Sequence, residues 1–146
     1  MVNIKGLGYI GLPTALMLAA HGVQVVGTDR SEALVDSLNK GKLTFEEKGL
    51  DALFHQALDA GIRFQTGDVE ADAYIIAVPT PYDHRTKKTD ARYVVAAVSE
   101  VLDICPKGAV VVVESTISPS TIDRNIRPLL KEKGREDVKL AHAPER

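Results

Sequence analysis

Apolar runs rich in β-branched residues alternate with helix-forming stretches along the chain. The apolar runs predict six strands, at residues 2–6, 23–28, 62–66, 73–78, 109–114 and 138–142. The stretches between them predict helices, at residues 14–20, 31–40, 50–60, 91–104 and 119–133. The fifth strand is apolar without a break over residues 109–113, as expected of a parallel strand covered on both faces. The alternation predicts an α/β protein with a doubly wound parallel sheet in the order 3-2-1-4-5-6.

Residues typical of helix ends support these boundaries. Ser31 is a candidate N-cap for the helix over residues 31–40, which Gly41 ends. Pro119 stands at a first-turn position of the last helix, and Gly134 follows its end. His84 and the run Arg85-Thr-Lys-Lys88 lie in a polar stretch that we expect to be a loop.

A glycine-rich turn joins the first strand to the first helix. Its pattern is Gly6-x-Gly8-x-x-Gly11, and the second strand ends just before Asp29. In a Rossmann-type fold, the first glycine permits a tight turn, the second lets the backbone approach a pyrophosphate, and the third lets helix and strand pack closely. The helix N-terminus attracts the phosphates. An acid at Asp29 can bind the adenosine ribose and favours NAD over NADP. The alternative is a βαβ unit whose glycines serve packing alone.

Ligands of such sheets bind beyond the carboxyl ends of the strands. The segments that leave those ends are rich in Gly, Pro, Ser, Thr or charged residues, and they span 6–11, 28–30, 79–82, 115–118 and 143–146. The sequence therefore places a binding site on one edge of the sheet.

Composition narrows the classes of partner and compartment. The 146 residues suit one domain, and the net charge of −2 offers no basic surface for nucleic acid or an anionic membrane. A single cysteine excludes an internal disulfide and fits a reducing compartment. No apolar run is long enough to span a membrane, no signal peptide precedes the first strand, and no metal-ligand spacing occurs. We therefore expect a cytoplasmic protein without a bound metal.

Five motifs in this order resemble the UDP-glucose/GDP-mannose dehydrogenase family over essentially the whole chain. They are Gly6-Leu-Gly-Tyr-Ile-Gly-Leu-Pro-Thr-Ala15, Asp29, Ala77-Val-Pro-Thr-Pro81, Glu114-Ser-Thr116 and Pro144-Glu-Arg146. The resemblance implies that residues 1–146 form the family's NAD-binding domain. The run Tyr9-Ile-Gly-Leu-Pro13 and the ending Pro144-Glu-Arg146 resemble the branch that oxidises UDP-N-acetylmannosamine.

The resemblance also implies roles for individual residues. The implied cofactor-binding residues are Gly6, Gly8, Tyr9, Ile10, Gly11, Asp29, Arg30, Val78, Pro79, Thr80, Pro81, Ser115 and Thr116. Thr116 and Glu145 are the implied catalytic residues, and Arg146 is implied to contact the sugar nucleotide. From the residues themselves, Thr116 could instead cap the following helix, and Glu145 could be a surface acid. Ser120 departs from the family, where the segment often reads Pro-x-Gly, and it could be a first-turn helix residue.

The family oxidises a nucleotide sugar to its uronic acid with two NAD, through a cysteine that holds the aldehyde as a thiohemiacetal. Cys105 lies at the amino-terminal rim of the predicted sheet, far from the cofactor edge, so we expect an inert buried thiol. The nucleophilic cysteine and an assisting lysine are expected outside this chain. We therefore expect a fragment, inactive by itself, that lacks a dimerisation helix and a sugar-nucleotide domain. The full-length protein is expected to be a homodimer that binds a UDP-sugar through the missing domain.

Two other functions fit parts of the pattern. One is a stand-alone NAD-binding or redox-sensing module. The other is the cofactor domain of a β-hydroxyacid-type dehydrogenase, which would carry lysine and asparagine, without an essential cysteine, in a later helical domain.

Overall fold

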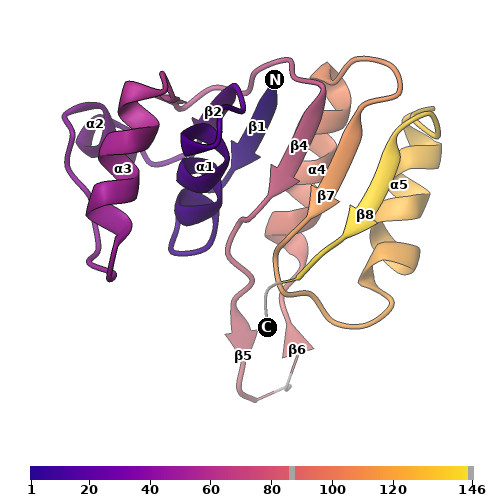
Figure 1. The fold of residues 1–146 in the computed structure, drawn as a ribbon. Coiled ribbons are helices and arrows are strands. Elements are labelled where there is room, and N and C mark those ends of the chain that lie inside the picture. The colour runs from indigo at the N-terminus through magenta and orange to yellow at the C-terminus, as the bar shows by residue number, and fades with distance from the viewer. Residues whose placement is uncertain (86–87, 145–146) are drawn as a thin grey trace.

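The computed structural model describes residues 1–85 and 88–144. Its main sheet has six parallel strands in the order β3-β2-β1-β4-β7-β8, which confirms the predicted topology (Figure 1). The strands are β1 (Val2–Lys5), β2 (Val25–Thr28), β3 (Arg63–Gln65), β4 (Ala73–Ile76), β7 (Val110–Val113) and β8 (Lys139–His142). Lys5, the last residue of β1, is paired with Thr28 of β2 on one side and with Ile76 of β4 on the other. The carboxyl ends of these three strands therefore meet at one edge.

Helices cover both faces of the sheet. They are α1 (Gly11–Ala20), α2 (Glu32–Asn39), α3 (Leu50–Asp59), α4 (Arg92–Ile104) and α5 (Arg127–Glu132), the last preceded by a π-helical turn η1 (Ile122–Ile126). The sheet separates two buried clusters, because successive side chains of a strand point to opposite faces. None of the helices in the described part of the chain is long and apolar enough to cross a membrane.

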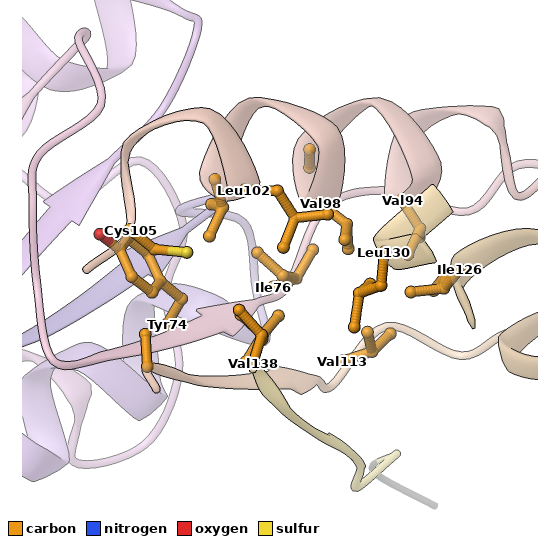
Figure 2. Packing of buried hydrophobic residues seen from close by; sticks show 14 of the residues in the cluster. Tyr74, Ile76, Val94, Val98, Leu102, Cys105, Val113, Ile126, Leu130 and Val138 are labelled. Carbon is orange, nitrogen blue, oxygen red and sulfur yellow. The ribbon is translucent and has the colours of Figure 1, made fainter. Parts of the chain in front are cut away.

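The first cluster lies under α1, α2 and α3. It includes Ile4, Leu16, Leu38 and Phe54. The second cluster lies under α4 and α5 and includes Ile76, Val98, Val113 and Ile126 (Figure 2).

Tyr74 and Cys105 close the second cluster at the amino-terminal edge of the sheet (Figure 2). The Tyr74 hydroxyl donates to the Val69 carbonyl (3.1 Å) and accepts from the Ala71 amide (2.8 Å). Burial raises the pKa of this phenol. The hydroxyl therefore stays neutral and ties the connection between β3 and β4 to the sheet.

The helix predicted over residues 119–133 is wrong at its start. Ser120 has a φ of +69°, in the left-handed region, so Ser120 and Pro119 precede the helix instead of forming its first turn. The Thr121 hydroxyl donates to the Ser118 carbonyl (2.7 Å) in the turn that leads into the helix. Pro128 explains the π-helical turn, because proline has no N–H to donate and its ring clashes with the carbonyl four residues earlier in an α-helix. The chain widens before Pro128, which then stands in the first turn of α5.

The polar stretch predicted as a loop contains a small antiparallel ladder. Strands β5 (Tyr82–Asp83) and β6 (Lys88–Thr89) pair, and the Asp90 amide donates to the Pro81 carbonyl (2.8 Å). The Tyr82 ring meets His84 edge-on, with 5.1 Å between ring centroids. The hairpin projects beyond the carboxyl ends of the sheet (Figure 1).

Candidate functional site

Gly6 and Gly11 are required by the packing of the chain itself. Gly6 has a φ of +97°, and its amide donates to the Thr28 carbonyl (2.8 Å). A Cβ on Gly6 would lie 2.6 Å from the Ala77 carbonyl oxygen, and one on Gly11 would lie 1.9 Å from the Gly6 carbonyl oxygen. Gly6 therefore takes the tight turn, and Gly11 the close packing of helix against strand, that the sequence predicted.

No contact among the described residues requires a glycine at position 8, in contrast to Gly6 and Gly11. A Cβ built there would meet nothing within 4 Å, and the adjacent Tyr9 side chain is 75% exposed. Helix α1 begins just beyond, at Gly11, with no side-chain cap at Ile10 and no acid in its first turn. A bare backbone at a helix N-terminus is suited to a phosphate group, because the amides and the helix dipole both favour an anion. The turn therefore fits the diphosphate of a dinucleotide.

The Asp29 carboxylate faces this turn. Its Oδ2 accepts from the Leu7 amide (2.8 Å), and its Oδ1 accepts from the Ser31 amide (2.9 Å). Each carboxylate oxygen keeps a further lone pair for another donor. The two bonds hold the carboxylate beside the place for a diphosphate, where ribose hydroxyls can donate to it.

A cavity of about 380 Å³ adjoins Asp29, within the range typical of small-molecule sites. Five of the predicted cofactor-binding residues line it, namely Gly6, Asp29, Arg30, Val78 and Pro79. Sequence reasoning missed the other lining residues, which are Lys5, Thr28, Ser31, Thr66, Asp68, Tyr93 and Ala97. Val78 and Ala97 give the cavity apolar surface on which a nucleobase can lie.

Four charged residues form a network at this cavity. The Lys5 ammonium pairs with Asp68 and lies 2.9 Å from Oε2 of Glu100, and Arg30 Nη2 pairs with Oε1 of Glu100. Burial opposes ionisation of Glu100, but the hydrogen bonds and charges of Lys5 and Arg30 outweigh it and hold the pKa of this carboxyl below its ordinary value. A lysine as the last residue of an apolar strand was the one sequence signal for this network.

The loops after β4 and β7 carry the other predicted residues. The Ser115 hydroxyl donates to the Val78 carbonyl (2.8 Å) and lies 3.2 Å from the Ile76 carbonyl, so it joins the two loops. Thr80 is partly buried, and Thr116 is exposed. Thr116 does not cap the following helix, because that helix has no side-chain cap and starts five residues later, at Thr121.

Glu114 connects this side of the site to the glycine turn. Its Oε1 accepts from the Thr14 hydroxyl (3.1 Å), a side chain near the start of α1. The strand end of β7 is therefore fastened to the helix that carries the turn. Glu145 and Arg146, the predicted catalytic and sugar-nucleotide residues, lie outside the described residues.

Cys105 lies away from this edge. It is buried at the end of α4, in the connection that leads to the start of β7, and it lies next to Tyr74 (Figure 2). Among residues 1–85 and 88–144, no three His, Cys, Asp or Glu side chains lie where they could hold a metal ion together.

Comparison with known proteins agrees with this geometry. The NAD-binding domain of the UDP-glucose/GDP-mannose dehydrogenase family matches residues 1–146. The UDP-N-acetyl-D-mannosamine dehydrogenase of Methanococcus maripaludis is 43% identical, over 99% of this chain and 34% of the relative. The solved UDP-N-acetyl-mannosamine dehydrogenase of Staphylococcus aureus is 39% identical with a TM-score of 0.94, over 99% of this chain and 36% of that one.

A second branch of the family has a similar fold. The GDP-mannose dehydrogenase of Pseudomonas aeruginosa is 31% identical with a TM-score of 0.89, over 99% of this chain and 36% of that one. The chain spans about a third of the length of these relatives. With the family match and the superposition both extending over its length, the chain belongs to the UDP-glucose/GDP-mannose dehydrogenase family and corresponds to its NAD-binding domain.

Proposed function

We propose that this chain is the cofactor domain of a nucleotide-sugar 6-dehydrogenase. The substrate is a UDP-hexose of the UDP-N-acetylmannosamine or UDP-glucose type, and the product is the UDP-uronic acid. The proposal depends chiefly on the position of the Asp29 carboxylate. This carboxylate accepts from the Leu7 amide in the glycine turn, next to the uncapped start of α1, and it lines a cavity large enough for part of a nucleotide. The 43% identity to a UDP-N-acetyl-D-mannosamine dehydrogenase supports the choice of sugar.

Each part of the site has a task in this reaction. The turn at Gly8 binds the diphosphate, Asp29 accepts from the ribose, and the cavity wall at Val78 holds the base. Bound NAD supplies a hydride acceptor. Thr80 and Thr116 flank the nicotinamide at the neighbouring strand ends, where Thr116 orients the reacting group.

The full oxidation removes two hydrides from one carbon, and water supplies the second oxygen of the acid. It needs a covalent hold on the aldehyde between the two steps, which we assign to a cysteine outside this chain, with an assisting lysine. Glu145 acts as a catalytic acid or base, and Arg146 begins the sugar-nucleotide contacts. The longer protein is a cytoplasmic homodimer that binds the UDP-sugar through a further domain.

Calorimetric titration of the chain with NAD and with NADP tests the cofactor step. We expect NAD to bind and NADP to bind more weakly, because a 2′-phosphate would meet the Asp29 carboxylate. Failure of well-folded protein to bind NAD at millimolar concentration would overturn the proposal.

Activity of the longer protein tests the substrate. We expect two NADH for each UDP-sugar consumed, with UDP-N-acetylmannosamine as the preferred substrate. A β-hydroxyacid-type enzyme would form one NADH for each substrate molecule, and a stand-alone NAD-binding module would form none.

A further inference from the structure

Asp29 and Arg30 are adjacent residues whose side chains favour different cofactors. An acid at the end of the second strand accepts from the ribose 2′-hydroxyl and favours NAD, whereas an arginine nearby accommodates the 2′-phosphate of NADP. Both residues line the same cavity. Since guanidinium groups bind phosphate in a bidentate manner, Arg30 would weaken the selectivity that Asp29 creates if it were free to turn to the ribose.

An ion pair with Glu100 holds the Arg30 side chain toward α4. Its Nη2 pairs with Oε1 of Glu100, a residue of α4 that lies 70 positions later in the sequence. The Arg30 side chain is 67% exposed, so packing does little to fix its direction. The pair with Glu100 is therefore the contact that directs the guanidinium toward α4.

Lys5 in turn fixes Glu100. The Lys5 ammonium lies 2.9 Å from Oε2 of Glu100 and also pairs with Asp68, and its side chain is only 9% exposed. A buried ammonium needs paired charges around it, so this end of the network is the least free to move. Glu100 thus bridges a buried cation and an exposed one.

We propose that Glu100 is a positioning residue for cofactor choice, which holds Arg30 against α4 and so prevents it from binding a 2′-phosphate. The inference rests on the proposed NAD-binding function and names a determinant of its selectivity. Asp29 repels the phosphate directly, and Glu100 withdraws the cation that would attract it.

The test is the Glu100→Gln variant, titrated calorimetrically with NAD and NADP. The substitution keeps the size of the side chain and removes its charge, so Arg30 loses its ion pair and only a neutral amide oxygen is left to hold it. We expect the ratio of the NADP to the NAD dissociation constant to fall about two- to fivefold, the range of a single exposed ion pair, mainly through tighter NADP binding. An unchanged ratio, or NADP binding no tighter than in the parent, overturns the inference.

Arg30→Ala separates positioning from simple charge. In that background Glu100→Gln is expected to leave the ratio unchanged, because the cation to be released is gone. An equal fall in both backgrounds would mean that Glu100 acts through its own charge, and it would overturn the inference.

Asp103→Asn is the matched control. Asp103 lies on the same helix and pairs with Lys133, away from the cavity, and the substitution changes the net charge equally. We expect no change in the ratio. If Glu100→Gln does not fold, Glu100→Asp keeps the charge but shortens the reach to Arg30, and it should lower the ratio in the same direction. Loss of NAD binding by the parent chain overturns the proposed function as well, whereas normal NAD binding with an unchanged ratio overturns this inference alone.

Discussion

At the scale of single residues, the three glycines of the turn have different causes. Gly6 and Gly11 are fixed by backbone contacts within the protein, as the clashes of a built Cβ with the Ala77 and Gly6 carbonyls demonstrate. Gly8 meets nothing within 4 Å, so the fold does not explain it. The glycine motif therefore combines two glycines that the fold requires with a third, Gly8, that we assign to the diphosphate of the proposed cofactor.

Replacing Gly8 and Gly11 with alanine should separate these causes. Gly11→Ala is expected to lower the free energy of unfolding by about 3 kcal/mol, because its Cβ would overlap a backbone carbonyl. Gly8→Ala should change stability by less than about 0.5 kcal/mol, yet weaken NAD binding about tenfold by keeping the diphosphate from the backbone. Urea unfolding and calorimetry measure the two effects. Normal NAD affinity in Gly8→Ala would contradict the diphosphate site.

Asp29→Ala tests the ribose contact. It removes a charged acceptor, so NAD binding should weaken about ten- to a hundredfold and the preference over NADP should shrink. Calorimetry with both dinucleotides gives the ratio, and thermal unfolding checks that the turn has not collapsed without its bond to Leu7. A preference that stayed at the parent value would remove Asp29 from this role.

At the scale of elements, hydrophobic periodicity was enough to predict the sheet and the five helical regions. It failed where one residue overrides the pattern. Pro128 stands inside an otherwise regular helical stretch, and a missing N–H turns that stretch into a π-helical turn followed by α5. The hairpin of β5 and β6 was missed because each strand has only two residues, too few for any period.

Ser120 offers a prediction at this scale. Its φ of +69° is unfavourable for a residue with a Cβ, and glycine adopts it freely. Ser120→Gly should raise the free energy of unfolding by about 0.5–1 kcal/mol, after allowance for the greater freedom of glycine in the unfolded chain. Thermal unfolding measures the gain, and Ser120→Ala, which keeps the strain, should give none. A less stable glycine variant would contradict the assignment of strain to this turn.

At the scale of the whole molecule, the two edges of the sheet have separate tasks. The glycine turn, Asp29 and the charged network gather at the carboxyl edge, as the topology predicted. The network itself could not be predicted, because Lys5, Asp68 and Glu100 are distant in sequence and meet only after folding. At the opposite edge, Arg135 donates to the Pro106 carbonyl (3.1 Å), and Asp137 accepts from the Gly108 amide (2.7 Å).

This opposite edge predicts a dependence of stability on pH. Arg135 and the Gly108 amide lower the pKa of Asp137 to about 2, from 3.8. A carboxyl whose pKa is depressed on folding stabilises the protein above its unfolded pKa, and the contribution disappears as the pH falls. Stability from this group should therefore decline between about pH 4 and pH 2. Urea unfolding across that range measures it, and Asp137→Asn should show a shallower decline. Parallel curves for the two proteins would contradict the linkage.

The open space beside Gly8 bears on how a bound dinucleotide would be exchanged. In the reaction that we propose for the longer protein, NADH must leave and a second NAD must bind before the oxidation is complete. Since nothing in the described chain crowds the space where a Gly8 side chain would stand, the diphosphate can leave and return without displacing the strands beneath it. We therefore expect the first dinucleotide to be exchanged for the second without a rearrangement of the turn that binds them.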